Sequence, residues 1–184
     1  YGDKTNTFFG VGLRKNILKN GFRGSEQDIL CLPTLYADID IKSKAHAQTS
    51  LPSSVDEAID FLHNLKIKPS IIVNSGNGIH SYWLLKKPFI IETENDRKYI
   101  ATIFKGFGKY INSEAKKLGW KIDNVYDLAR ILRIPGTINH KLGTGTKCEV
   151  ISYTGVRYKI SDFMQVIHSH DVVAPISKTA QSVN

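Results

Sequence analysis

Three short polar clusters stand within apolar stretches of this 184-residue sequence. The first is the pair Asp38 and Asp40, the second is the segment 75–80 (Ser-Gly-Asn-Gly-Ile-His), and the third extends from Asp123 to Thr137. Carboxylate oxygens are the ligands that Mg²⁺ and Mn²⁺ prefer, whereas arginine side chains and backbone N–H groups bind phosphate oxygens. The clusters together therefore indicate a site for a divalent cation and a triphosphate.

The first cluster lies in an apolar segment, residues 29–41, that we expect to form a central strand. Side chains alternate between the faces of a strand, so Asp38 and Asp40 share one face while Ile39 points to the other. Two carboxylates about 7 Å apart on one face are able to hold divalent ions. An acidic solvent-facing strand has the same pattern, so the pair alone is weak evidence.

The second cluster combines a flexible turn with two polar side chains. Gly76 and Gly78 allow positive φ values and a close approach of backbone N–H groups to phosphate. Ser75 adds a hydroxyl group, and His80 begins the next expected strand. The alternative is an ordinary hairpin turn followed by an ordinary strand histidine.

The third cluster places Asp123 seven residues before Arg130 and ten before Arg133, with Lys141 beyond a Pro-Gly turn. Guanidinium groups bind phosphate oxygens in a bidentate manner. The alternative is a helix over residues 125–132 whose arginines are solvated. We favour a functional interpretation, because a solvated helix does not need the polar, turn-rich segment that follows.

The elements that carry these clusters mix strands with helices. Capping patterns of the Ser/Thr-x-x-Asp/Glu type mark the beginnings of two helices. We expect strands at 7–13, 29–41, 70–73, 79–85 and 147–153, and helices at 54–66, 93–118 and 161–168. A hairpin around the second cluster, together with this mixture, predicts an α+β fold rather than a doubly wound parallel sheet.

Composition narrows the class of protein. The net charge of +8 favours a nucleic-acid partner. No apolar run approaches the roughly 20 residues of a membrane span, and no signal peptide is evident, so we expect a cytoplasmic protein without a membrane partner. Cys31 and Cys148 are far apart and lack the spacing of zinc ligands, so no zinc is expected.

In this order, the three clusters resemble the motifs of the archaeo-eukaryotic primase superfamily, particularly the primase-polymerases of phages, plasmids and related mobile elements. Asp38-Ile39-Asp40 is similar to the first motif, DxD, and the segment 75–80 is similar to the second. Asp123, followed by the two arginines, is similar to the third. The resemblance covers roughly residues 6–155. Asp127 competes with Asp123 for the third carboxylate, and we prefer Asp123 because its distance to Arg133 fits better.

The resemblance implies an RRM-like antiparallel sheet flanked by helices, and a DNA primase-polymerase that transfers nucleotides from NTPs or dNTPs on a single-stranded DNA template. It implies that Asp38, Asp40 and Asp123 hold two Mg²⁺ or Mn²⁺ ions. It implies that the triphosphate is bound by Ser75, Gly76, Gly78, His80, Arg130, Arg133 and Lys141. The candidates for contacts with nucleic acid are Arg14, Arg23 and His140.

The resemblance also suggests how the chain is organised. We expect residues 1–170 to form the catalytic domain and residues 171–184 to form a linker-like tail. Because the chain begins at Tyr1 rather than Met, we expect a fragment of a longer prokaryotic protein, phage- or plasmid-encoded, with a C-terminal helicase or accessory domain.

Three other classes of protein remain as alternatives. A non-catalytic domain that binds single-stranded nucleic acid would use Phe8, Phe9, Tyr82 and Trp83 for stacking, but it leaves the carboxylates unexplained. A rolling-circle initiator nuclease is suggested by the pair of histidines in 168–170, although no tyrosine follows them. A DxD glycosyltransferase leaves the second and third clusters without a role.

Overall fold

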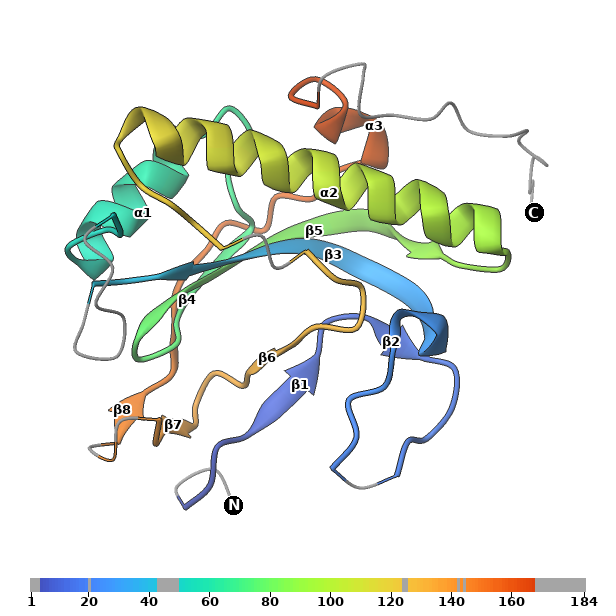
Figure 1. Cartoon of the computed structure of the whole chain (residues 1–184), viewed down its shortest axis with the longest axis horizontal. Helices are drawn as coiled ribbons and strands as arrows, with labels where there is room; N and C mark the ends of the chain where they lie inside the picture. The colour runs from blue at the N-terminus through green and yellow to red at the C-terminus, as the bar shows by residue number, and fades with distance from the viewer. Residues whose placement is uncertain are drawn as a thin grey trace.

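The computed structural model of the chain describes residues 4–19, 21–42, 50–123, 126–141, 143 and 145–167. A five-stranded antiparallel sheet in the order β2-β3-β5-β4-β9 lies at its centre. The helices cover one face of this sheet, and two small two-stranded sheets lie on the other side (Figure 1). The expected α+β class is confirmed.

The elements have the following bounds. The central sheet contains β2 (Leu13–Arg14), β3 (Ile29–Asp40), β4 (Ile71–Asn74), β5 (Gly78–Ile90) and β9 (Glu149–Tyr153). The small sheets pair β1 (Phe8–Gly10) with β6 (Ile131–Arg133), and β7 (Ile138–Asn139) with β8 (Thr146–Lys147). The helices are the 3-10 turn η1 (Glu26–Asp28), α1 (Val55–Asn64), α2 (Glu94–Lys117) and α3 (Ile160–Phe163).

Both long helices begin at the caps that the sequence predicts. The hydroxyl group of Ser54 accepts a hydrogen bond from the N–H of Glu57 at 3.1 Å. The hydroxyl group of Thr93 accepts one from the N–H of Asp96, and the carboxylate of Asp96 accepts one from the N–H of Thr93. These bonds satisfy first-turn N–H groups that have no partner inside a helix, which fixes where the helices start.

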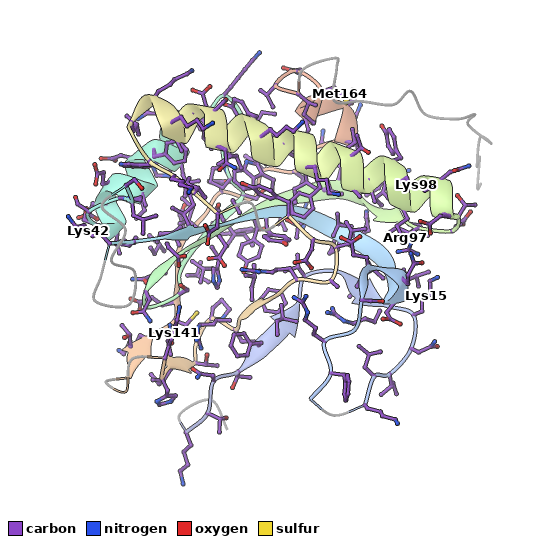
Figure 2. All side chains as sticks on the ribbon, viewed as in Figure 1. Lys15, Lys42, Arg97, Lys98, Lys141 and Met164 are labelled. Atoms are coloured by element: carbon purple, nitrogen blue, oxygen red, sulfur yellow. The ribbon has the colours of Figure 1, made fainter. Side chains whose placement is uncertain are left out.

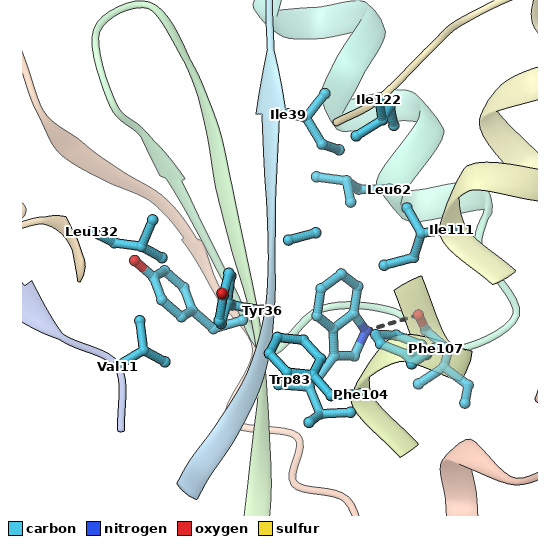
Figure 3. Packing of buried hydrophobic residues seen from close by; sticks show 14 of the residues in the cluster. Val11, Tyr36, Ile39, Leu62, Trp83, Phe104, Phe107, Ile111, Ile122 and Leu132 are labelled. Carbon is cyan, nitrogen blue, oxygen red and sulfur yellow. Dashed lines mark hydrogen bonds between the residues drawn. The ribbon is translucent and has the colours of Figure 1, made fainter. Parts of the chain in front are cut away.

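The main apolar core lies between the helices and the sheet. Figure 3 shows Ile39, Leu62, Trp83, Phe104, Phe107 and Ile111 on one side of β3, with Val11 and Leu132 on the other. The rings of Trp83 and Phe107 meet edge to face with centroids 4.9 Å apart, and both side chains are fully buried. The Trp83 indole N–H donates to the carbonyl oxygen of Ile67 at 3.0 Å, so its polar atom is also satisfied. This layer anchors the strands that carry the first two polar clusters.

Four sequence predictions differ from the structure in detail. The expected strand 7–13 is divided between β1 and β2, which belong to different sheets. The expected strand 147–153 is divided in the same way, at the buried Cys148. The last helix, α3, is only four residues long. The alternative helix over 125–132 is wrong, because residues 131–133 form strand β6.

The division of 7–13 coincides with a close approach of two segments. At Gly12, between β1 and β2, an added Cβ would lie 2.8 Å from the carbonyl oxygen of Leu128, so this position leaves no room for a side chain. The N–H of Val11 donates to the carbonyl oxygen of Arg130 at 2.9 Å, which attaches the turn between the two strands to the third cluster. These contacts are long-range, and a local pattern does not contain them.

Other expectations concern the thiols, the membrane and the C-terminal end. Cys31 and Cys148 are both buried free thiols. Among the helices that the structure describes, none combines the length and the apolar character that crossing a membrane requires. The histidine pair in 168–170 and the expected tail 171–184 lie outside the described residues.

Candidate active site

A cavity of about 170 Å³ lies on the face of the sheet that the helices leave free, between β3, β5 and the ribbon formed by β1 and β6. Figure 2 shows Lys141 beside β7, on the side of the sheet opposite α2, whereas Lys98 lies on the helical side. The cavity is lined by Phe8, Asp38, Asp40, Ser75, Asn77, His80, Arg130, Ile131, Leu132, Arg133, Asn139 and Lys141. All three polar clusters of the sequence therefore contribute side chains to one cavity.

Strand register brings the first two clusters together. β3 and β5 are antiparallel, with Asp38 directly opposite His80 and Asp40 directly opposite Gly78. Directly opposite residues project from the same face of a sheet. The Nε2 atom of His80 consequently lies 3.7 Å from Oδ1 of Asp38.

The ribbon of β1 and β6 adds the third cluster. Arg130 donates from Nη2 to Oδ2 of Asp38 at 2.8 Å. Leu132 is buried opposite Phe9, and the ring of Phe9 lies 6.2 Å from that of Tyr82 on β5. These apolar contacts hold the ribbon against the sheet and thereby place Arg130 over the carboxylates.

Arg133 is held by two neutral groups. Its guanidinium carbon lies 4.8 Å from the centroid of the Phe8 ring, and Nη1 donates to Oδ1 of Asn6 at 2.6 Å. The same oxygen of Asn6 accepts the N–H of His140 at 2.8 Å. Because neither partner carries a charge, the positive charge of Arg133 is available to an anion in the cavity.

Several buried polar atoms of this cavity have no hydrogen-bond partner among the described residues. They are Nδ2 of Asn77, Nδ1 of His80 and Nε of Arg130. A buried polar atom without a partner costs about 1–3 kcal/mol. Three such atoms around one cavity indicate a site that a polar ligand completes.

The pKa values of the cavity follow from burial and from the charges nearby. Burial lowers the pKa of His80, and the opposing effect of Asp38 does not restore its ordinary value. Burial also lowers the pKa of Arg133. For Arg130 burial acts in the same direction, but the hydrogen bond and the charge of Asp38 raise its pKa overall. At neutral pH the cavity therefore holds a neutral imidazole between charged guanidinium groups and carboxylates.

The glycine turn is required by the hairpin itself. Gly76 has a φ of +90°, and its N–H donates to Oδ1 of Asn74 at 2.8 Å. An added Cβ at Gly78 would lie 2.7 Å from the carbonyl oxygen of Ile39. The hydroxyl group of Ser75 donates to the carbonyl oxygen of Gly78 at 3.0 Å while facing the cavity. Phosphate binding by the glycines stays a prediction.

Two asparagines were not identified from the sequence as site residues. Asn77, inside the glycine turn, lines the cavity. Asn139 is buried, donates from Nδ2 to the carbonyl oxygen of Ser75 at 2.7 Å, and accepts the N–H of Lys141 at 2.9 Å. It thus joins the second cluster to the third. The available signal was the polar run from Asn139 to Lys141 that follows the apolar Ile138.

The structure does not bring Asp123 to the cavity. Asp123 is exposed in the coil after α2 and is not among the residues that line the cavity. Asp127 is half-buried, and its Oδ1 atom is buried without a hydrogen-bond partner among the described residues. Tyr36 on β3 donates its hydroxyl proton to the carbonyl oxygen of Asp127 at 2.9 Å. Of the two candidates, Asp127 therefore lies beside the strand of the first cluster, although it too is not among the residues that line the cavity.

The expected cluster of three carboxylates is not assembled in the described residues. Within those ranges, no three His, Cys, Asp or Glu side chains are placed so that they could hold a metal ion together. Asp38 and Asp40 nevertheless line one cavity. Because Mg²⁺ is commonly held by one or two carboxylates, with water and substrate phosphates as the other ligands, this pair fits such an ion.

The three residues expected to contact nucleic acid differ in their surroundings. Arg14 donates to the carbonyl oxygens of Gly12 at 2.7 Å, Arg23 at 2.8 Å and Ala129 at 3.1 Å, so its guanidinium group binds backbone. Arg23 is exposed, with Nη1 4.0 Å from Oδ2 of Asp127. His140 is half-buried beside β7 and does not line the cavity. Their contacts with nucleic acid stay predictions.

Comparison with known proteins agrees with this architecture. No family model and no curated protein matches the sequence. Among solved structures, the chain is similar to the AEP domain of the primase-polymerase of cyanophage S-2L, with a TM-score of 0.53 and 18% identity over 89% of this chain and 70% of that one. It also matches the primase RepB′, with a TM-score of 0.44 and 11% identity over 72% of this chain and 40% of that one.

The first of these similarities shows the fold. The chain has the archaeo-eukaryotic primase fold, as the resemblance of its three motifs implied. An identity of 18% carries no conclusion about activity, which must be argued from the cavity itself.

Proposed function

We propose that this domain is a DNA primase-polymerase, which joins NTPs or dNTPs to a primer or an initiating nucleotide on single-stranded DNA. One observation carries the proposal. A single cavity on a primase-polymerase fold is lined by two carboxylates, a histidine and three basic side chains. Carboxylates suit a divalent cation and basic groups suit a triphosphate, so this mixture matches the two charged parts of a metal-bound nucleotide.

Asp38 and Asp40 would hold Mg²⁺ or Mn²⁺ in this cavity. When bound, such ions lower the pKa of an attacking hydroxyl group and neutralise charge on the leaving pyrophosphate. Arg130 donates to Oδ2 of Asp38 at 2.8 Å, and Oδ1 of Asp38 lies 3.7 Å from Nε2 of His80. A cation held by Asp38 would compete with Arg130 for this carboxylate, and a guanidinium group released in this way would be available to a phosphate oxygen.

The size of the cavity limits what it can hold. Its volume of about 170 Å³ is well below the roughly 300 Å³ at which pockets for small molecules begin, so it suits the phosphate chain rather than a whole nucleotide. Arg133, Lys141 and the unpartnered Nδ1 of His80 would bind that chain.

The reaction is then mostly a matter of positioning. The 3′-oxygen attacks the α-phosphorus, the bond from that phosphorus to the bridging oxygen breaks, and pyrophosphate leaves, while the hydroxyl proton passes to water. Side chains fixed around the phosphates stabilise the charge that develops in the transition state.

We assign the third carboxylate of the site to Asp127. Its Oδ1 atom lacks a partner among the described residues, and its charge, with that of Asp38, helps to raise the pKa of Arg130. Asp127→Asn should lower incorporation by about 10²–10³-fold, whereas Asp123→Asn should have little effect. Primer extension by the two variants decides which aspartate is the third carboxylate. A large loss in Asp123→Asn with little effect in Asp127→Asn would assign that role to Asp123.

Primer extension tests the proposed function itself. The 184-residue chain is incubated with single-stranded template, labelled nucleotides and Mg²⁺ or Mn²⁺, with and without a primer. Wild type should extend the primer, and the Asp38→Ala, Asp40→Ala double variant should not. Asp56→Ala with Asp60→Ala is the matched control, since these exposed acids of α1 lie outside the cavity. Template binding without incorporation by the wild type would favour a non-catalytic binding domain.

A further inference from the structure

A basic loop connects β2 to η1 and lies on the same side of the sheet as the candidate active site. We call residues 15–19 and 21–23 the basic loop. It contains Lys15, Lys19 and Arg23 and no acidic residue. Figure 1 shows this segment projecting from the sheet on the side where β1 and β6 lie, opposite α2.

Arg14 fixes the base of this loop. Its guanidinium group donates to the carbonyl oxygen of Arg23 from both Nε, at 3.0 Å, and Nη2, at 2.8 Å. It also donates to the carbonyl oxygen of Ala129, the residue before Arg130. The loop is thus closed at its ends and attached to the segment that carries the phosphate-binding arginines.

The apolar residues of the loop divide into inward and outward positions. Leu18 is half-buried and packs toward Gly24, where an added Cβ would lie 2.8 Å from its Cδ1 atom. Ile17 is fully exposed, and Phe22 is 73% exposed. Since Leu18 already serves the packing of the loop, Ile17 and Phe22 are not required for it.

A second cavity lies between this loop and the β1–β6 ribbon. Its volume is about 860 Å³, and its lining includes Arg14, Ile17, Phe22 and Arg23. No Asp or Glu is among the described residues that line it. Phe8 and Ile131 line both this cavity and the smaller one, so the two are neighbours that share a wall.

We propose that the basic loop and the larger cavity bind the single-stranded DNA template beside the active site, an inference that rests on the proposed function. Phe22 and Ile17 contact the faces of unpaired bases, and Lys15, Lys19 and Arg23 contact phosphates. The unpaired bases of a single strand expose their faces, which can contact the outward-pointing side chains of Ile17 and Phe22. The phosphates of the strand meet no carboxylate among the described residues that line the cavity. The bases of a duplex are stacked on one another, so their faces are not available to these side chains.

The test measures binding of labelled oligothymidine, and of a duplex of equal length, by fluorescence anisotropy without nucleotide or metal. Phe22→Ser should weaken single-strand binding by roughly 5- to 150-fold, the factor expected from losing one stacked base. Phe22→Trp, which keeps a ring, should restore it. Leu118→Ser is the matched control, because Leu118 is also an exposed apolar residue but follows α2 on the helical side.

The contribution of the charged residues is measured separately, from the dependence of the affinity on salt concentration. Lys19→Gln should lower the slope of log affinity against log salt by about 0.7, the value for one phosphate contact on a single strand. Phe22→Ser should leave that slope unchanged, because a ring releases no counterions. An unchanged slope in Lys19→Gln would mean that Lys19 does not contact a phosphate, and it would contradict the proposal that the basic loop binds the DNA backbone.

The outcomes separate this inference from the proposed function. If Phe22→Ser leaves single-strand affinity unchanged, or lowers duplex affinity equally, the basic loop is not the binding site for single-stranded DNA. This holds even if the wild type extends a primer. Loss of single-strand affinity in Phe22→Ser supports the loop even where the wild type incorporates no nucleotide. Self-association that Phe22→Ser abolishes, with DNA affinity intact, would instead assign this surface to a second copy of the chain and overturn the proposal.

Discussion

Trp83 and His80 lie three residues apart on β5, on opposite faces of the sheet, and their surroundings differ in kind. Trp83 faces the helices, is fully buried, and has its indole N–H bonded to the carbonyl oxygen of Ile67. His80 faces the ribbon and is also buried, but its Nδ1 atom has no partner among the described residues, and Nε2 lies 3.7 Å from Asp38. The protein itself satisfies the polar atom of Trp83, whereas it leaves Nδ1 of His80 beside the cavity without a partner among the described residues.

We therefore expect the two faces of the sheet to contribute differently to the stability of the fold and to the binding of a ligand. Apolar burial on the helical face stabilises the fold, and each aromatic ring removed there should cost free energy of unfolding. Buried polar atoms without partners lower stability, and under the proposed function the bound nucleotide would satisfy those of the cavity. Variants of the two faces should therefore separate into those that unfold the domain and those that only weaken binding.

The largest effect on stability is expected on the helical face. Trp83→Ala removes a fully buried ring that packs on Phe107, and it should lower the free energy of unfolding by about 3–5 kcal/mol. Urea denaturation followed by circular dichroism measures this. Tyr153→Ala, at an exposed position of β9, is the control and should cost far less. If the two variants lost the same free energy of unfolding, the helical face would not be the main source of stability, and the contrast between the two faces would fail.

A smaller effect, of another kind, is expected on the polar face. Arg133→Ala should weaken binding of a labelled nucleotide with Mg²⁺ by about 10- to 150-fold, which is the loss of roughly 1.5–3 kcal/mol for a hydrogen bond to a charged group. Its unfolding free energy should change little, because its partners are the Phe8 ring and Asn6 at a half-buried site. Unchanged nucleotide affinity, measured by equilibrium titration, would exclude Arg133 from the phosphate site.

The smallest effect concerns the cap of α2 and depends on pH. Hydrogen bonds from the hydroxyl group and then the N–H of Thr93 lower the pKa of Asp96 in the folded state. A lowered pKa stabilises the fold above the unfolded value of 3.8, and this contribution disappears as the pH falls through the folded value. Since Asp96 is only half-buried and solvent screens its charge, Asp96→Asn should cost less than about 1 kcal/mol at pH 7.

Urea denaturation of the wild type and Asp96→Asn across pH 7 to about 2.5 measures this difference. The two stabilities should begin to converge as the pH falls below 3.8, and they should meet once it has fallen below the lowered folded-state pKa of Asp96, where the carboxyl group is protonated in both states. A difference that persists at the acid end would mean that the cap acts through something other than the charge of Asp96.

Local patterns in the sequence predict much of this architecture. The N-caps Ser54 and Thr93 mark α1 and α2, because a cap depends only on neighbours a few residues away. Alternation along β3 places Asp38 and Asp40 on one face, and the hairpin through Gly76 sets the register that brings His80 opposite Asp38. For the first two clusters, the sequence therefore predicts much of the site as well as the fold.

The rest depends on contacts between distant segments. Arg14 resembles a residue free to bind nucleic acid, but it is bonded to the carbonyl oxygens of Arg23 and Ala129. Asn139 joins Ser75 to the third cluster, which no spacing in the sequence reveals. The preference for Asp123 rested on its distance along the chain from Arg133, whereas tertiary packing places Asp127 beside Tyr36. Such contacts follow from how the ribbon packs on the sheet.

The central claim is that the polar face is a nucleotidyl-transfer site, and primer extension tests it most directly. We predict that the wild-type chain extends a primer on single-stranded DNA with Mg²⁺ or Mn²⁺, and that Asp38→Ala with Asp40→Ala lowers incorporation by at least about 10³-fold while the domain remains folded. Product formation by the folded double variant at the wild-type rate would contradict the claim.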